Sequence, residues 1–143
     1  MKPSNENCIF CKIVAGTIPA TLVHEDAAAL AFMDLGQVNP GHVLVTTKSH
    51  AQDIFELADE DAGAVFRATA RVARAVREAF RPQGLTLLQA NGKAALQSVP
   101  HFHIHVLPRW EGDGMSLAWP AKNPPREKLE EYAAKIRGSL ARG

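Results

Sequence analysis

Three histidines alternate with apolar residues in the segment His101–Leu107, which reads His-Phe-His-Ile-His-Val-Leu. In an extended strand the side chains alternate between faces, so the imidazoles would share one face and the apolar residues the other. The apolar face can pack on a core, while the histidine face presents nucleophiles, bases or metal ligands. Because histidine changes charge near neutral pH without a perturbed pKa, this crowding favours a chemical role over a merely histidine-rich half-buried strand.

Chemistry at phosphorus is one candidate for this strand. A neutral imidazole is a good nucleophile toward phosphorus and a good leaving group afterwards. His103, the central histidine, would have its neighbours about 7 Å away along the strand, and one of them can bind phosphate. A backbone carbonyl could orient the central ring through its second nitrogen. Ser98 lies just upstream, where its hydroxyl could donate to a leaving group or form an ordinary turn.

Metal binding is the competing candidate, because Cys8 and Cys11 form a Cys-x-x-Cys pair. A spacing of three places both cysteines on the same side of a short helix. His50 and one strand histidine could complete a Cys₂His₂ zinc site. Two reduced thiols fit the spacing equally well, whereas a thioredoxin-like redox role lacks the βαβ frame that it needs.

The bulk properties narrow the class of protein. A chain of 143 residues is expected to form one domain spanning 1–143, with a core of its own. Sixteen Lys and Arg balance fifteen Asp and Glu, so no net field favours a nucleic acid or an anionic membrane as partner. We find neither a signal peptide nor an apolar stretch of transmembrane length, and expect a cytoplasmic protein whose cysteines are thiols or metal ligands.

The elements that must position these residues follow from periodicity and turn residues. They are a helical turn at 8–13, strands at 21–25, 29–33, 42–47, 85–90 and 101–107, and helices at 59–80 and 126–140. Residues 1–7 are expected to fray, and 111–143 to form a C-terminal loop and helix extension. Strands that are adjacent in sequence, with one long helix across a face, favour an α+β fold with an antiparallel sheet of about five strands.

The two helices are predicted from their apolar stripes. The first stripe consists of Val65, Phe66, Thr69, Val72, Ala73, Val76 and Phe80, and the second of Leu129, Tyr132, Ala133, Ile136 and Leu140. Acidic residues begin the long helix, and Pro82 and Gly84 end it. Its arginines lie mostly off the stripe without interleaved aromatic residues, which indicates a solvated face rather than a nucleic-acid surface.

Six segments, in order along the chain, resemble the histidine triad (HIT) superfamily, and most closely its Hint-like branch of histidine triad nucleotide-binding proteins. The segments are Cys8–Ile13, Ala31–Asp34, Pro40–Val45, Lys48–His50, Gln97–Val99 and His101–Leu107. The resemblance implies a HIT-like fold and a homodimer in which two protomers form one continuous sheet.

The resemblance also implies roles for individual residues. His103 would be the nucleophile that attacks the α-phosphorus, His105 would contact the phosphate oxygens, and His42 would lie behind the triad in its hydrogen-bond network. Ser98 and Gln97 would contact the phosphate or leaving group, with Asn91 nearby.

The nucleotide and a metal would be held by further residues of the same segments. Asp34 matches the ribose-binding carboxylate of the family, and the apolar base pocket would consist of Ile9, Phe10, Ile13, Phe32 and Leu35. In bacterial relatives with a two-cysteine start, a structural zinc site is formed by residues that correspond here to Cys8, Cys11, His50 and His101.

Three departures from the Hint pattern bear on specificity. Ala95-Leu96 replaces a Gly-Gly pair before Gln97, and Leu107-Pro108-Arg109 resembles the dinucleoside polyphosphate hydrolase branch. The tail beyond Trp119-Pro120 is longer than in short Hint proteins. Because family dimers use such tails to shape the partner's site, Trp110 or Trp119 could influence specificity.

The function expected from these features is hydrolysis at the α-phosphate of purine nucleoside 5′-phosphate derivatives. The expected bond is P–N, as in an adenosine 5′-phosphoramidate, and the expected intermediate is a nucleotidyl-histidine. One alternative keeps the chemistry and takes a dinucleoside polyphosphate as substrate. Others are a nucleotide-binding or scaffold protein with little turnover, and a metal-binding structural module with an inert triad.

Overall fold

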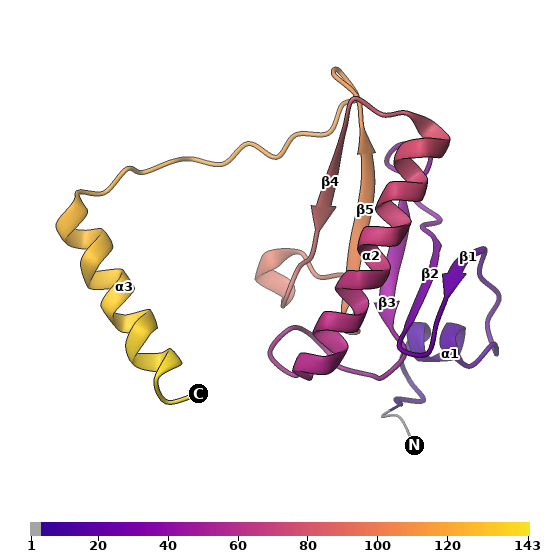
Figure 1. Ribbon diagram of the computed structural model, residues 1–143, viewed down its shortest axis with the longest axis horizontal. Helices are drawn as coiled ribbons and strands as arrows, with labels where there is room; N and C mark the ends of the chain where they lie inside the picture. The colour runs from indigo at the N-terminus through magenta and orange to yellow at the C-terminus, as the bar shows by residue number, and fades with distance from the viewer. Residues whose placement is uncertain (1–3) are drawn as a thin grey trace.

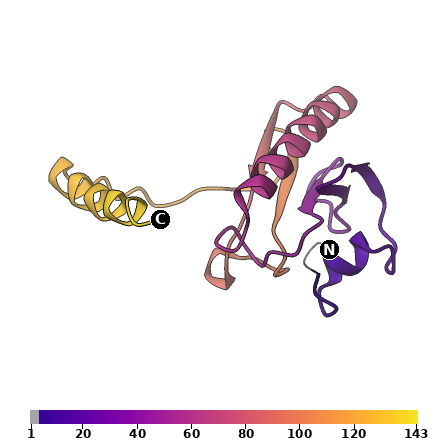
Figure 2. The ribbon, with the colours of Figure 1, turned by 60° about the horizontal axis from the view of Figure 1, so that its bottom comes forward.

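Residues 4–143 are described by a computed structural model, in which a five-stranded sheet lies between two helices and a third helix stands apart (Figures 1 and 2). The elements are α1 (Ile9–Val14), β1 (Leu22–Glu25), β2 (Ala29–Met33), β3 (Val43–Thr47), α2 (Asp59–Phe80), β4 (Gly84–Leu88), the 3₁₀ turn η1 (Lys93–Ala95), β5 (His103–Arg109) and α3 (Arg126–Leu140). All pairings are antiparallel, in the order β1-β2-β3-β5-β4. This confirms the predicted α+β class. Residues 1–3 of the segment expected to fray lie outside the described part of the chain.

The two faces of the sheet carry different cores because side chains alternate along each strand. Toward α2, the buried cluster joins helix and strand residues: Ala29, Ala31, Val43, Val45, Val65, Ala68, Val72, Val76, Phe102, Ile104 and Val106. Toward α1, a smaller cluster is formed by Cys8, Phe10, Cys11, Leu30, Phe32 and Leu44. His103 and His105 alternate with Ile104 and Val106, and therefore lie on the α1 face of β5.

Helix α2 spans the predicted residues, but its buried face differs slightly from the predicted stripe. Asp59, Glu60 and Asp61 lie in its first turn, where they suit the positive end of the helix dipole. Ala68 is buried, whereas Phe66 and Phe80 are exposed by 57% and 43%. Two members of the predicted stripe were therefore wrong as core residues. Phe80 instead covers Gly41, where a Cβ atom would lie 2.8 Å from its ring.

Strand β5 begins two residues later than predicted, at His103 rather than His101. The His101 N–H bonds to the Val99 carbonyl, and the Phe102 N–H bonds to the Ala51 carbonyl, both at 2.8 Å. These two residues are thus held by loops and not by the strand ladder. Smaller errors affect 42–47, where β3 begins at Val43, and 85–90, where β4 is Gly84–Leu88.

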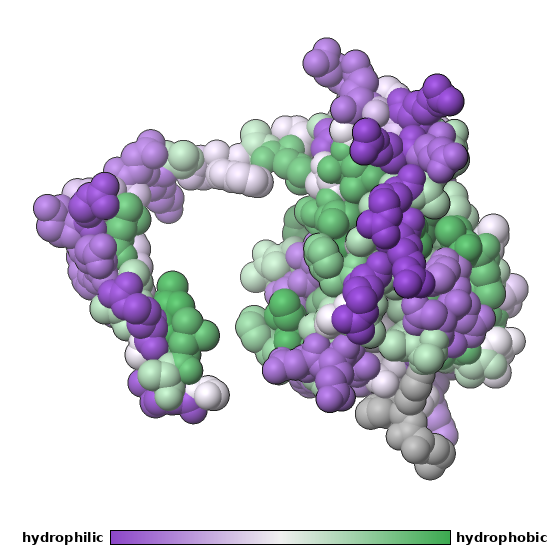
Figure 3. All heavy atoms as spheres, in the orientation of Figure 1, coloured by the Kyte–Doolittle hydropathy of each residue, from purple (hydrophilic) through white to green (hydrophobic). Residues whose placement is uncertain are grey.

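Helix α3 has the predicted bounds and buries no residue. An extended segment rich in glycine and proline carries it away from the sheet on the β4 side (Figure 1). Its apolar side chains lie along the side that faces the rest of the molecule (Figure 3), and Leu129, Tyr132, Ile136 and Leu140 are all exposed. Across residues 4–143, none of the helices combines the length and apolar character that crossing a bilayer requires.

Candidate functional site

A cavity of about 230 Å³ opens between α1, the end of β2 and the histidine face of β5. Nine residues expected from the sequence line it: Ile9, Phe10, Ile13, Phe32, Asp34, Leu35, Ser98, His103 and His105. It is also lined by six residues that the sequence did not single out: Pro19, Ala20, Thr21, Met33, Leu44 and Val99. Most of these are small or apolar residues in ordinary contexts, with no local pattern that marks them.

His103 has one ring nitrogen engaged and one free. Its Nδ1 donates to the His101 carbonyl at 2.7 Å, so a neutral ring carries its lone pair on Nε2. Burial lowers the pKa of His103, which keeps the ring neutral near pH 7. The edge of Phe10 packs against this ring, with centroids 5.0 Å apart. This is the arrangement that a nitrogen nucleophile requires.

His42 and His105 form a hydrogen-bonded pair whose protons can be assigned. The Val38 N–H donates to His42 Nδ1 at 3.2 Å, so neutral His42 carries its proton on Nε2. That nitrogen lies 2.9 Å from His105 Nδ1 and donates to it. Neutral His105 therefore carries its own proton on Nε2. His42 lies behind His105 and outside the cavity lining.

Asp34 lies beside this pair. Its Oδ1 accepts from the Gly36 N–H at 2.8 Å, and its Oδ2 lies 3.3 Å from His42 Nε2 and 3.9 Å from His105 Nδ1. The three side chains could in principle hold a metal ion. A metal on His42 Nε2 would move the ring proton to Nδ1, where it would oppose the Val38 N–H. The cluster is therefore a hydrogen-bond network rather than a metal site.

The four residues expected to bind zinc do come together. His101 Nδ1 lies 3.3 Å from Cys8 Sγ, 3.5 Å from Cys11 Sγ and 3.3 Å from His50 Nδ1. Cys11 Sγ lies 3.3 Å from His50 Nδ1. A tetrahedral zinc ion, at about 2.3 Å from sulfur and about 2.0–2.1 Å from nitrogen, holds its ligand atoms about 3.3–3.8 Å apart. The donor set and its spacing fit zinc.

His101 connects this cluster, which we call the Cys/His clip (Cys8, Cys11, His50 and His101), to the cavity. Its Nε2 donates to the Thr47 carbonyl at 2.7 Å, which leaves Nδ1 as a lone-pair donor facing the clip. Its own carbonyl accepts from His103. The three histidines of the segment thus have different surroundings, and His101 belongs to the clip.

Gln97 and Asn91 do not line the cavity. The Gln97 amide donates to the carbonyls of Gln52 and Val99 and accepts from the Gly92 N–H at 2.7 Å. The Asn91 side chain bonds to Gln89 and to the Ile54 N–H. Both side chains brace the loop that follows β4.

Leu96 occupies the left-handed region, with φ of 70°. The Hint pattern has glycine at this point, and glycine adopts this conformation without a steric penalty. The Leu96 N–H bonds to the Lys93 carbonyl and the Gln97 N–H to the Gly92 carbonyl, which holds the turn despite the added side chain.

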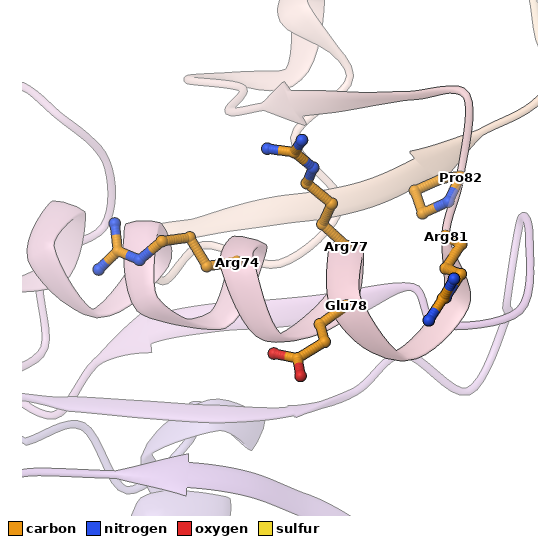
Figure 4. A pocket seen from close by; sticks show the side chains of 5 residues that line it. All are labelled: Arg74, Arg77, Glu78, Arg81 and Pro82. Atoms are coloured by element: carbon orange, nitrogen blue, oxygen red, sulfur yellow. The ribbon is translucent and has the colours of Figure 1, made fainter.

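Two other surface hollows offer fewer reactive side chains than the cavity. One, of about 530 Å³, lies at the end of α2, where Arg74 and Arg77 project to one side and Glu78 and Arg81 to the other (Figure 4). It contains no nucleophile. The second surrounds Arg109, whose guanidinium binds Asp113 at 2.7 Å and holds the pKa of that carboxyl far below its usual range. Arg109 therefore braces the turn after β5.

Because the His105 ring is largely buried, we expect the free energy of unfolding to depend on pH. Burial lowers the pKa of His105 from 6.5 to about 4, so the unfolded chain binds a proton there before the folded chain does. Stability is then lost as the pH falls from about 6.5 toward about 4. We expect urea unfolding to give a lower free energy at pH 5 than at pH 7.5, with a weaker dependence in H105N. Equal pH dependence in both proteins would contradict this assignment.

Comparisons with known proteins give one matching family model and several similar proteins and structures. A family model described as HIT domain matches residues 15–112. The chain is 36% identical over 136 residues to adenosine 5′-monophosphoramidase hnt1 of Schizosaccharomyces pombe, covering 92% of this chain and 99% of the relative. It resembles the crystal structure of a HIT family protein from Bacillus anthracis, with a TM-score of 0.90, 42% identity, and 95% and 99% of the two chains covered. It also resembles a Zn-bound histidine triad family protein from Mycobacterium smegmatis, with a TM-score of 0.73, 34% identity, and 93% and 97% covered.

Proposed function

Because this chain belongs to the HIT domain family, we propose that it hydrolyses purine nucleoside 5′-phosphate derivatives at the α-phosphorus, cleaving the P–N bond of adenosine 5′-phosphoramidate-type substrates. The observation that carries the proposal is the free Nε2 of His103, in a neutral ring lining a cavity. The relative from Schizosaccharomyces pombe is named as a monophosphoramidase, which supports the choice of nitrogen as the leaving group.

In the first step, His103 Nε2 attacks the α-phosphorus and forms a P–N bond. The bond from phosphorus to the substrate nitrogen breaks, and the departing amine takes the electron pair together with a proton that solvent supplies through the Ser98 hydroxyl. Ser98 lines the cavity and is the side chain proposed to donate near the leaving group. The proton on His105 Nε2 is available for a phosphate oxygen, and it stabilises the charge that develops there.

In the second step, water attacks the nucleotidyl-histidine. A new P–O bond forms, and the P–N bond to His103 breaks and returns its electron pair to Nε2. The attacking water releases one proton to solvent, which balances the proton taken up in the first step, and the nucleoside monophosphate leaves with the imidazole restored to its neutral form. The hydrogen bond from His103 Nδ1 to the His101 carbonyl persists through both steps and stabilises positive charge on the ring while the nucleotide is attached.

The nucleoside would occupy the remainder of the cavity. Asp34 offers a carboxylate to the ribose hydroxyls, and the purine would lie among apolar residues. Phe10 and Phe32 meet edge to face there, with centroids 5.3 Å apart. Ile9, Ile13 and Leu35 complete the apolar part, and Leu35 is fully exposed at its mouth. Three of these five apolar residues, Ile9, Phe10 and Ile13, belong to α1.

The Cys/His clip is proposed to hold a structural zinc ion. Both cysteines are buried free thiols, and burial raises the pKa of Cys11, so metal binding would displace its proton. Zinc would tie α1 to the loops that carry His50 and His101, and thereby fix the wall of the base pocket. The proposed role of the zinc ion is structural and not catalytic.

The active unit is proposed to be a homodimer with a continuous sheet. β4 is an edge strand, and unpaired edges are sites of pairing with a second chain. Beside it an apolar hollow of about 300 Å³ is lined by Ile54, Phe66, Leu87, Leu88, Gln89, Phe102 and Ile104. A second copy of the chain would cover this surface. Sedimentation equilibrium tests the homodimer, because it measures the mass of the assembly in solution directly. We also propose that the protein is cytoplasmic and acts without nucleic acid or membrane partners.

The proposed substrate class is tested by comparing specificity constants. We expect kcat/KM for an adenosine 5′-phosphoramidate to exceed that for diadenosine triphosphate by at least about tenfold, a difference of about 1.4 kcal/mol in transition-state binding. Arg109, part of the segment that resembles the polyphosphate hydrolases, is bound to Asp113 and lies outside the cavity lining. A preference for the triphosphate would overturn the choice of substrate and leave the nucleophile unchanged.

A further inference from the structure

The side chain of Gln37 joins the two ends of the loop that carries Asp34 and His42. Its Nε2 donates to the Asp34 carbonyl at 2.6 Å and to the His42 carbonyl at 2.7 Å. Its Oε1 accepts from the N–H groups of Gly41 and His42, at 3.0 and 3.1 Å. This orientation of the amide matches donors with acceptors at all four contacts. An exposed glutamine therefore closes the loop across its base.

The closed loop has a direct effect on His42. Val38 follows Gln37, and its N–H donates to His42 Nδ1 at 3.2 Å. This bond requires the loop to bring His42 back under Val38. The Gln37 amide holds both ends of the loop, together with backbone bonds from the Asp34 N–H to the His42 carbonyl at 3.1 Å and from the His42 N–H to the Asn39 carbonyl at 3.2 Å. If the loop opened, the Val38 N–H would no longer hold Nδ1 as an acceptor, and the Asp34 carboxylate, 3.3 Å from Nε2, would be the remaining contact that favours the proton there. Because the Gln37 amide also holds the Asp34 carbonyl, opening the loop would weaken that contact too.

We propose that Gln37 is a positioning residue that fixes the tautomer of His42 and, through it, makes His105 a proton donor to the substrate. The chain of contacts runs from the Gln37 amide to the Val38 N–H, to His42, and from His42 Nε2 to His105 Nδ1 at 2.9 Å. The part that concerns the substrate rests on the proposed function, whereas the tautomer of His42 does not.

Gln37 contacts neither the cavity nor the nucleophile. It acts at a distance on a group that stabilises the phosphate, so its loss should lower kcat more than it raises KM. Misplacement of a catalytic group by about 1 Å can cost about 100-fold in rate. We expect a loss of about 10- to 100-fold in kcat when the amide is removed.

The test uses the full-length variant Q37M, which keeps the length of the side chain and removes the strong hydrogen-bonding groups. Q83M is the matched control, because the Gln83 amide accepts from the Glu111 N–H on a loop away from the histidines. Long-range ¹H–¹⁵N spectra of ¹⁵N-histidine protein report the tautomer of each ring. The unfolding midpoint and the kinetics with adenosine 5′-phosphoramidate complete the measurement.

We expect His42 to show two well-separated ¹⁵N resonances in the wild type and in Q83M, and converging resonances in Q37M. Converging resonances with a lower kcat and a nearly unchanged KM support the proposal. Unchanged His42 resonances in Q37M overturn it, whatever happens to the rate. If the wild type fails to hydrolyse the phosphoramidate, the proposed function fails, and the His42 resonances still decide the positioning role.

Discussion

Replacing His103 with alanine is expected to abolish turnover while leaving the fold and nucleotide binding largely intact. The variant removes the Nε2 lone pair that is free to attack phosphorus, and no second imidazole occupies the same position. His105 Nδ1 is engaged by His42, and its Nε2 carries a proton in the neutral ring. Removal of a catalytic nucleophile costs about 10⁴- to 10⁶-fold in kcat. Steady-state assays and nucleotide titration by calorimetry measure the two quantities.

The matched control for this variant is H24A. His24 is part-buried on β1, and among residues 4–143 its ring pairs only with Asp26, at 3.3 Å, so its loss should leave turnover unchanged. Near-normal turnover by H103A would refute the assignment of the nucleophile. Loss of nucleotide binding together with turnover would show that His103 is needed for the fold of the site rather than for its chemistry.

Replacing His101 with alanine is expected to destabilise the protein by about 1–3 kcal/mol, the range for removing one partner of a buried hydrogen bond. The ring is completely buried. Its removal takes from the Thr47 carbonyl its short hydrogen bond of 2.7 Å and leaves it the Thr46 hydroxyl at 3.5 Å. It also takes one ligand from the Cys/His clip. Urea unfolding gives the free energy, and elemental analysis of the purified protein gives zinc per chain, expected to be near one in the wild type and far lower in H101A.

The variant H50A separates the two causes of this loss. His50 shares the clip but is only half-buried, and its ring makes no hydrogen bond comparable to the one between His101 and Thr47. We expect H50A to lose zinc and to lose less stability than H101A. An H101A protein that keeps both its zinc and its stability would refute the division of roles within the triad.

Much of the site could be predicted from the sequence because its residues sit at fixed positions on regular elements. The alternation of β5 determines that His103 and His105 face α1 while Ile104 and Val106 face α2. The spacing of Cys8 and Cys11 on one helical turn likewise places both thiols on the same side. Local periodicity is sufficient to predict which face these side chains occupy.

The errors arise where long-range contacts override local pattern. The apolar alternation extends back to His101, but the carbonyls of Val99 and Ala51 capture the N–H groups of His101 and Phe102 and delay the strand. For Gln97, expected at the phosphate, the structure shows an amide that bonds to backbone groups of two loops, and its contact with a phosphate stays a prediction. No sequence pattern marks Gln37, because its contacts depend on the path of the loop between Asp34 and His42. Helix α3 has a clear stripe, yet periodicity alone does not say what covers it.

The central claim is that His103 becomes covalently nucleotidylated, and it is tested most directly by rapid-mix intact-mass spectrometry during turnover of an adenosine 5′-phosphoramidate. We expect a transient mass increase of one nucleoside monophosphate per chain, mapped to His103 by fragmentation and missing in H103A. Turnover without any such adduct, or with the adduct on another residue, would contradict it.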